Sequence, residues 1–399
     1  MNEIQFAPND KRHSTDTRAF SQKATECVRR LHQATPGYAR TPLIERKDLA
    51  RRLGIGAVFV KDESKRFGLN AFKGLGGVYA MHRMICEALG LDGDDTTPRQ
   101  LTQPPYHDRV SQLTFVTTTD GNHGKGVSWA AGLYGCKAHV FMPRGSVEAR
   151  AQAIRDAGSA DVTITDLRYD DCVRHTRALA EKNGWFLIQD TAWPGYEKVP
   201  LWIMQGYTTL YFEALSQMRA LGSAMPTHLL LQAGVGAMAG AIAGAALESC
   251  GDTPPVIATV EAREVACFYE SFERGDGLPH PATGSGETIM AGLNCAEPCT
   301  IAWEILGGRA VGGFACADTI AERGMRLLAE GQESAGPVIS GESGAVTAGL
   351  AEALAEPDRE NLRNALGLDS RSVLLLISTE GDTDPENYRR VVSGRSRKP

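Results

Sequence analysis

The chain has 399 residues, of which 42% are hydrophobic and 23% are charged, and its formal net charge is −6. This length suffices for two domains, and the slight negative charge argues against nucleic acid or an anionic membrane surface as a partner. No apolar run approaches the roughly 18 residues that a membrane-spanning helix needs, and the N-terminus lacks the apolar segment of a secretion signal. The nine cysteines have no paired spacing, which is typical of reduced thiols, so we expect a cytoplasmic protein.

After a polar stretch over residues 1–32, which we expect to form an N-terminal arm, short apolar runs alternate with longer helical ones. Most of the apolar runs are continuous, as in strands that are buried on both faces of a parallel sheet. The predicted strands are residues 57–62, 113–118, 137–142, 161–165, 186–190, 228–233, 256–261 and 373–379. The predicted helices include 147–158 and 199–222, and the stretch 91–109, rich in Pro, Asp and Thr, is predicted to be a surface insertion. This alternation predicts an open, doubly wound α/β fold, in which ligands bind beyond the carboxyl ends of the strands.

The segment KDESKRFGLNAFKGLGG, residues 61–77, runs from a predicted strand through a loop into a helix with an apolar stripe. Lys73 stands at the start of this helix beside Phe72. Apolar neighbours and a helix N-terminus both favour a neutral amine, which Schiff-base chemistry requires. The alternative is a surface lysine that only begins a helix. The N-x-F-K pattern before a glycine-rich helix resembles the cofactor-lysine motif of fold-type II pyridoxal-phosphate enzymes, the tryptophan synthase β-like family, which includes the serine and threonine dehydratases.

The loop TTTDGNHGKG, residues 117–126, follows a predicted strand and opens the next helix. Successive backbone N–H groups at a helix N-terminus bind anions, and a glycine turn without a chemical role is the alternative. The loop resembles the S-S-G-N-H loop of the serine and threonine dehydratases, which holds the substrate carboxylate. By this resemblance Asn122 faces the cofactor oxygen O3′. The substrate carboxylate is then faced by Thr119, Gly121 and His123.

Asp120 stands where the dehydratases carry a serine. It can act as a helix N-cap, or it can transfer protons on the face of the cofactor opposite Lys73, and the two roles are compatible. A second carboxylate, Asp190, ends the predicted strand 186–190. Two carboxylates near a small pocket suit a substrate with an additional ammonium group, although a solvated strand end remains the alternative for Asp190.

The segment HLLLQAGVGAMAGAIAGAALES, residues 228–249, is predicted to be a strand, a glycine turn and a helix. Gly234, Gly236 and Ala239 match the dinucleotide fingerprint G-x-G-x-x-G/A, and Glu261 ends the next strand, so an NAD(P)-dependent oxidoreductase is the rival function. A single phosphate on the backbone N–H groups satisfies the same geometry, and Glu261 is then a structural residue. The predicted phosphate-binding residues are Gly234, Val235, Gly236, Ala237 and Met238.

Two later segments, SGESGAV at 340–346 and ISTEGDTD at 377–384, end apolar runs in polar turns. In the resembled family, a Ser or Thr after the last core strand bonds the pyridine nitrogen, a place that Ser378 and Thr379 occupy, with Thr379 preferred. A neutral partner leaves the ring unprotonated, which favours elimination over transamination. Glu342 lies in a segment that resembles the family's E-P-S-G-A run and is expected to line the pocket.

The remaining cysteines and histidines point to no metal site, because Cys295 and Cys299 have no partners at zinc-site spacing. Cys267 and Cys295 bracket a glycine-rich segment, and a disulfide between them is left open, although the cytoplasm disfavours it. His82 falls on an apolar helix stripe and is expected to be a packed residue.

Seven segments together resemble the diaminopropionate ammonia-lyase family, both in their amino-acid sequences and in their order along the chain, from about residue 35 to the last strand. They are KDESKRFGLNAFK, TTTDGNHG, QDTAW, LLQAGVGAMAG, IMAGLNC, SGESGAV and ISTEGDTD. The resemblance implies two doubly wound, mostly parallel-sheet domains with the active site in the cleft between them. Residues 33–72 and 205–399 are expected to form the larger, phosphate-binding domain, and residues 73–204 the smaller, substrate-side domain.

The resemblance also implies a homodimer that binds pyridoxal 5′-phosphate and converts 2,3-diaminopropionate, a small amino acid, to pyruvate and ammonia. Lys73 or Asp120 would take the Cα proton, each from its own face, so that both enantiomers react. Asp120 or Asp190 would protonate the leaving amine, because an unprotonated amine leaves poorly. A serine or threonine dehydratase of the same fold is the nearest alternative.

Overall fold

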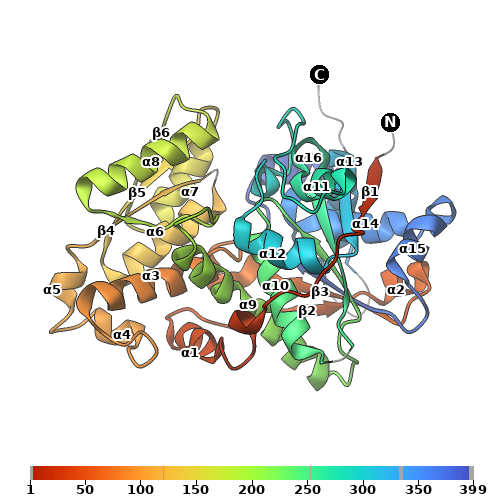
Figure 1. The fold of residues 1–399 in the computed structure, drawn as a ribbon, viewed down its shortest axis with the longest axis horizontal. Coiled ribbons are helices and arrows are strands. Elements are labelled where there is room, and N and C mark those ends of the chain that lie inside the picture. The colour runs from red at the N-terminus through yellow and green to blue at the C-terminus, as the bar shows by residue number, and fades with distance from the viewer. Residues whose placement is uncertain (1–2, 120, 252, 332–335, 395–399) are drawn as a thin grey trace. The chain divides into compact units, whose positions relative to one another are not determined.

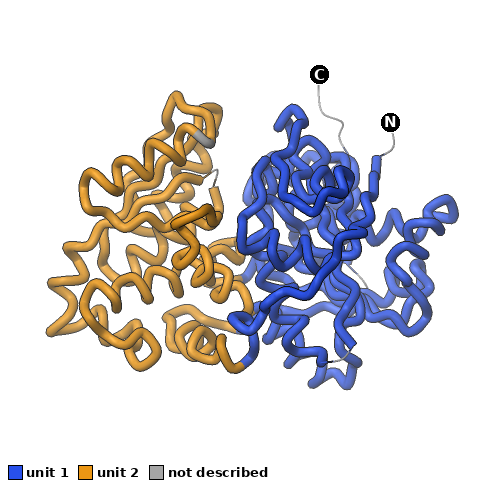
Figure 2. The backbone as a smooth tube through the Cα atoms, in the orientation of Figure 1, with its two compact units in different colours: residues 1–22, 40–65, 210–399 blue, residues 23–39, 66–209 orange. Residues whose placement is uncertain are grey.

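The computed structural model describes residues 3–119, 121–251, 253–331 and 336–394. The chain divides into two compact units, shown in different colours in Figure 2. Unit 1 comprises residues 1–22, 40–65 and 210–399, and unit 2 comprises residues 23–39 and 66–209. Within the described ranges, no helix is both long enough and apolar enough to cross a membrane.

Unit 1 contains a seven-stranded sheet in the order β1-β10-β9-β8-β11-β3-β2. Figure 1 labels three of its strands, β1, β2 and β3. The inner strands are parallel to one another, and the edge strands β1 and β2 are antiparallel to their neighbours. The strands are β1 (Ile4–Pro8), β2 (Leu43–Glu45), β3 (Ala57–Asp62), β8 (His228–Gln232), β9 (Val256–Ala262), β10 (Gly312–Cys316) and β11 (Val373–Ser378). The α-helices are α2 (Lys47–Leu53), α10 (Ala237–Ser249), α11 (Cys267–Arg274), α12 (Thr300–Arg309), α13 (Asp318–Ala329), α14 (Glu342–Leu354), α15 (Glu360–Leu366) and α16 (Pro385–Val392).

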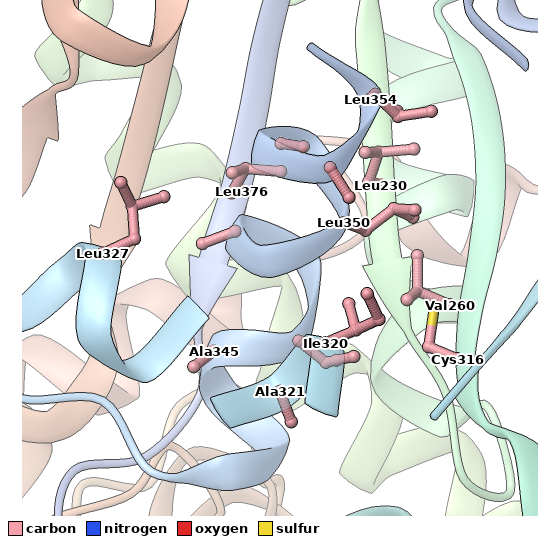
Figure 3. Packing of buried hydrophobic residues seen from close by; sticks show 14 of the residues in the cluster. Leu230, Val260, Cys316, Ile320, Ala321, Leu327, Ala345, Leu350, Leu354 and Leu376 are labelled. Carbon is pink, nitrogen blue, oxygen red and sulfur yellow. The ribbon is translucent and has the colours of Figure 1, made fainter. Parts of the chain in front are cut away.

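The central strands of unit 1 are buried along their whole length. Every residue of β8 and β11 is buried, because helices cover both faces of the sheet. Figure 3 shows Leu230, Val260 and Leu376 on their strands beside side chains of α13 and α14. Burial of both faces is the reason that these strands have continuous apolar sequences. The predicted doubly wound α/β architecture is therefore confirmed.

Unit 2 contains a four-stranded, fully parallel sheet in the order β6-β5-β4-β7. The strands are β4 (Thr114–Thr118), β5 (Lys137–Met142), β6 (Ala160–Ile164) and β7 (Phe186–Leu187). The α-helices are α1 (Glu26–Ala34), α3 (Gly74–Leu89), α4 (Pro98–Leu101), α5 (His107–Val110), α6 (Asn122–Tyr134), α7 (Glu148–Ala157), α8 (Tyr169–Asn183) and α9 (Lys198–Ala220), which begins in unit 2 and ends in unit 1.

The N-terminal segment differs from the expected unpatterned arm, since residues 4–8 form β1 and pair with β10. Neither strand was predicted, because β10 has the glycine-rich sequence GGFAC. A Cβ atom on Gly312 would lie 2.3 Å from the Ala7 carbonyl oxygen, so glycine is what allows the two backbones to approach. Ile4 and Ala7 are buried by this pairing.

The predicted insertion at 91–109 belongs to unit 2 and contains α4. Its Leu101 is fully buried, and Thr97 and Gln100 form a capping box at the start of the helix. The assignment of phosphate binding and substrate binding to separate domains stays a prediction.

Candidate active site

Lys73 immediately precedes the first residue of α3. Its Nζ lies 2.5 Å from Oδ2 of Asp190, and it lies 5.4 and 5.8 Å from the ring centroids of Phe72 and Tyr207. The lysine side chain is 18% exposed, so the amine is mostly enclosed. Unit 2 thus places this amine against a carboxylate and two aromatic rings.

The glycines after Lys73 allow α3 to pack closely against its neighbours. A Cβ on Gly76 would lie 2.7 Å from Cε1 of Tyr207, and one on Gly77 would lie 3.2 Å from the backbone of Gly126 in α6. Larger residues at these positions would push α3 away from α6 and α9. The glycine-rich run after the lysine therefore holds the helix that positions Lys73.

Asp190 lies beyond the end of β7 and is buried. Burial opposes its ionised form, but His123 and Lys73 outweigh this effect and lower the pKa of Asp190 to about 2. Asp190 is therefore a carboxylate near neutral pH and the direct partner of the Lys73 amine.

His123, in the first turn of α6, approaches the same Asp190 oxygen as Lys73 does. Its Nε2–H donates to the Ile188 carbonyl oxygen at 2.8 Å, and its Nδ1 lies 3.7 Å from Oδ2 of Asp190. Among the residues that the structure describes, Nδ1 has no hydrogen-bond partner. Burial lowers the pKa of His123, which favours the neutral ring. The side chain thus faces Asp190, and the predicted contact with the substrate carboxylate stays a prediction.

The loop before α6 is organised by Thr119, whose Oγ1 accepts hydrogen bonds from the N–H groups of Gly121 and Gly124, at 2.9 and 3.2 Å. Asn122 is the first residue of α6. The N-cap residue of α6 is Gly121, which has no side chain, and the Thr119 hydroxyl therefore takes the place of a capping side chain for the Gly124 N–H. A helix N-terminus of this kind suits a carboxylate. Asp120, the predicted proton-transfer residue, lies outside the described residues.

The glycine turn after β8 leads directly into α10. Gly236 has φ +87°, which favours glycine, and a Cβ there would lie 2.5 Å from the ring of Phe268. A Cβ on Gly234 would lie 3.1 Å from Leu293. The N-cap residue of α10 is Gly236, which has no side chain to cap the helix, so the backbone N–H groups at its start, from Val235 to Met238, suit a phosphate group.

Ser378 and Thr379 at the end of β11 are both buried but have different partners. The Ser378 hydroxyl donates to Oγ of Ser340 at 2.8 Å. Oγ1 of Thr379 accepts a long hydrogen bond of 3.4 Å from Nε2 of Gln232, which leaves its own O–H able to donate. This arrangement agrees with the preference for Thr379 as the partner of a ring nitrogen.

Glu342 begins α14 and is only 5% exposed. Burial, and then the neighbouring Glu380 carboxylate, raise the pKa of Glu342 to about 7. Nδ2 of Asn387 donates a hydrogen bond to Oε1 of Glu342. Unit 1 therefore holds a buried carboxyl group that changes its protonation near neutral pH.

Glu261, which the dinucleotide interpretation would need as a ribose ligand, is fully buried. Its two carboxylate oxygens accept the backbone N–H groups of Phe268 and Tyr269, at 2.8 and 2.7 Å, in the first turn of α11. Burial raises the pKa of Glu261 to about 8. These contacts agree with the expected structural role of Glu261.

Two residues near these groups were missed by the sequence reasoning. Tyr207 lies beside Lys73, and Gln232 links the end of β8 to β11 through a 2.7 Å hydrogen bond to the Ile377 carbonyl oxygen. Both residues stand inside apolar segments, where the sequence carries no signal of a polar contact. The nine cysteines, among them Cys267 and Cys295, are free thiols in the structure. No group of three or more His, Cys, Asp or Glu side chains in the described ranges is arranged to hold a metal ion.

Comparisons with known proteins agree with one another. A family model described as "Pyridoxal-phosphate dependent enzyme" matches residues 34–376. The diaminopropionate ammonia-lyase of Salmonella typhimurium strain LT2 is 47% identical over 369 residues, which cover 92% of this chain and 91% of that protein. The crystal structure of the holo diaminopropionate ammonia-lyase from Escherichia coli has a TM-score of 0.90 at 45% identity, covering 98% of this chain and 96% of that one. The structure of the same enzyme with an aminoacrylate-PLP azomethine reaction intermediate has a TM-score of 0.89 at 44% identity, covering 98% and 97%.

The similarity extends over nearly the whole of both chains, and the family model covers the segments that carry Lys73 and the glycine turn after β8. On this evidence the chain belongs to the diaminopropionate ammonia-lyases, within the family of pyridoxal-phosphate dependent enzymes.

Proposed function

We propose that this protein binds pyridoxal 5′-phosphate through Lys73 and eliminates ammonia from 2,3-diaminopropionate, giving pyruvate and ammonia. The observation that carries the proposal is the mostly buried Lys73 amine, 2.5 Å from the Asp190 carboxylate, in a chain that is 47% identical to a diaminopropionate ammonia-lyase. A lysine that is mostly buried, paired with a carboxylate and followed by a glycine-rich helix start is typical of a residue that forms a Schiff base.

The residues of both units fit this cofactor. The glycine turn at Gly234 and Gly236, with the uncapped start of α10, suits its phosphate. Thr379 would donate to the ring nitrogen, Asn122 would face O3′, and Lys73 would attach to the aldehyde carbon. When bound, the cofactor withdraws electrons from Cα, which acidifies the Cα proton and allows the β-amino group to leave.

The substrate carboxylate would bind at the start of α6. The Nε2–H of His123 is engaged with the Ile188 carbonyl oxygen, so we propose that His123 contributes its backbone N–H, together with Gly121 and the hydroxyl of Thr119. We also propose Glu342 as a pocket residue, whose raised pKa would let it meet the substrate as a neutral acid or as a carboxylate.

Proton transfer would use both faces of the substrate. Once detached from the cofactor, Lys73 would take the Cα proton from one face, and Asp120 would take it from the other, so that both enantiomers react. The low pKa of Asp190 favours Asp120 as the acid for the leaving amine, since a carboxylate that stays ionised cannot deliver a proton. We assign Asp190 the role of holding the Lys73 amine and its charge.

An absorbance spectrum of the purified protein, followed by product analysis, tests the proposal. We expect a visible band that is absent from Lys73→Ala and present in Lys65→Ala, which removes an exposed lysine of the same segment. Both diaminopropionates should give pyruvate and ammonia faster than L-serine gives pyruvate or L-threonine gives 2-oxobutyrate. A chain that acts faster on L-threonine would be a dehydratase, and one that binds a nicotinamide without the band would be an oxidoreductase.

We also propose a cytoplasmic homodimer that takes part in amino-acid catabolism. The nine free cysteines support a reducing compartment. Light scattering of the holoenzyme should give about twice the mass of one chain, and a monomer mass would contradict the dimer. Cell fractionation tests the compartment.

A further inference from the structure

We infer that Tyr207 is a positioning residue whose hydroxyl holds the Lys73 amine whenever that amine is detached from the cofactor. The inference rests on the proposed function, because detachment of Lys73 is a step of that function. It concerns a residue of α9 that lies far from Lys73 in the sequence.

Tyr207 is fully buried and is held by close contacts on two sides. The ring of Phe72 meets its ring edge-on at 4.7 Å between centroids. A Cβ on Gly76 would lie 2.7 Å from its Cε1, so glycine is needed to make room for the ring. These contacts fix the ring, and with it the direction of the hydroxyl, beside Lys73, whose Nζ lies 5.8 Å from the ring centroid.

The hydroxyl of Tyr207 has no hydrogen-bond partner within the described residues. Leaving a buried hydroxyl without a partner is costly, so the Tyr207 hydroxyl gains from a hydrogen bond to any polar group that comes within its reach. The Lys73 ammonium interacts electrostatically with this hydroxyl and favours its ionised form, although burial raises the pKa of Tyr207 overall. The moving amine of Lys73 is the partner that the geometry offers.

A hydroxyl complements Asp190 because it can both donate and accept. The ionised Asp190 carboxylate only accepts hydrogen bonds, so it stabilises the ammonium form of Lys73. The neutral amine has one lone pair, which can accept a hydrogen bond from Tyr207 O–H before the reaction and must turn to Cα to take the proton. After the proton has moved from Cα to Nζ, the same oxygen accepts a hydrogen bond from the ammonium. Tyr207 thus keeps Lys73 in place in both protonation states.

Tyr207→Phe tests this role, because it removes the hydroxyl and keeps the ring that packs on Phe72. In this variant the neutral Lys73 amine loses the hydrogen bond from Tyr207, whereas the ammonium form keeps its ion pair with Asp190. The ammonium form is then favoured, so the acidic limb of the kcat–pH profile should move to higher pH. At neutral pH we expect kcat to fall by about tenfold, as for one lost hydrogen bond to a reacting group, with a smaller change in KM. The loss should be greatest for the enantiomer that Asp120→Asn leaves more active.

The second readout does not depend on turnover. After removal of the cofactor, the full-length chain should regain its visible band more slowly in Tyr207→Phe than in wild type at neutral pH, and equally fast at high pH, where the amine is neutral in both. Tyr211→Phe is the matched control, since Tyr211 is buried on the same helix and its hydroxyl also lacks a hydrogen-bond partner in the described ranges, but it lies near Cys250.

A Tyr207→Phe protein that matches wild type in both readouts would overturn the inference, as would equal effects of Tyr207→Phe and Tyr211→Phe. If wild type itself lacks the visible band, or releases no pyruvate and ammonia from either diaminopropionate, the proposed function fails first and the inference fails with it. If wild type is active and Tyr207→Phe does not differ from it, only the role of Tyr207 is overturned and the proposed function stands.

Discussion

The Lys73 amine and the Asp190 carboxylate form an ion pair inside unit 2, with side-chain exposures of only 18% and 10%. Removing one partner of such a pair is costly, because the remaining charge loses its compensation. The pair joins the start of α3 to the residue just beyond β7, two segments that only the packing of unit 2 brings together.

Asp190→Asn should lower kcat by roughly 100-fold for both enantiomers, because both reactions need a correctly held Lys73. Steady-state assays of pyruvate release measure this effect. Asp161→Asn is the control, since the Asp161 side chain is 86% exposed and should leave kcat unchanged. Wild-type activity of Asp190→Asn would remove Asp190 from the mechanism.

Asp120→Asn should abolish turnover of one enantiomer and spare more of the other, because it removes the base on one face and leaves Lys73 on the other. The measurement is kcat for D- and L-2,3-diaminopropionate assayed separately. Equal losses for the two enantiomers would contradict the assignment of one base to each face.

Gly236→Ala should weaken cofactor binding by more than tenfold. An alanine at φ +87° is strained by roughly 1–2 kcal/mol, and its Cβ would lie 2.5 Å from the ring of Phe268, so the turn at the start of α10 must shift. Titration of the cofactor-free protein with pyridoxal phosphate, followed by absorbance, gives the dissociation constant. Gly222→Ala introduces similar strain at φ +70° with no atom within 4 Å of the new Cβ, and it should bind the cofactor normally.

Glu342→Gln should stabilise the protein at high pH. The pKa of Glu342 is about 7 in the folded chain against an ordinary value of 4.5, so the folded state binds the additional proton between these two values. Stability is therefore lost as the pH rises from 4.5 through 7, and a neutral glutamine avoids a loss of up to about 3 kcal/mol at pH 8.

Urea unfolding of wild type and Glu342→Gln at pH 8 and pH 5 measures this difference, which should be smaller at pH 5. Glu360→Gln is the matched control, because Glu360 also begins a helix but is exposed. A gain in stability that is the same at both pH values would show that the charge of Glu342 is not its cause.

The sequence predicted best those elements whose hydrophobic pattern follows directly from their burial. The strand at 57–62 is β3 to the residue, because a continuous apolar run needs burial on both faces. The strand at 137–142 is β5, whose residues alternate between buried and more exposed positions. The strands β1 and β10 were missed, since a glycine-rich strand has no such pattern until a partner approaches it. The family, its cofactor and its fold class, all predicted from seven segments, are confirmed.

The sequence by itself determined the family and its cofactor, and it predicted Lys73 and the glycine turn at Gly236 as site residues, because each lies in a short segment that encodes its own local geometry. Only the tertiary structure decided what surrounds the amine. Asp190, His123 and Tyr207 come from separate segments of the chain, and their places beside Lys73 depend on how closely α3, α6 and α9 pack. That packing depends in turn on glycines such as Gly76. A side chain at Gly76 would collide with the neighbouring helix, and this requirement becomes visible only in the folded structure.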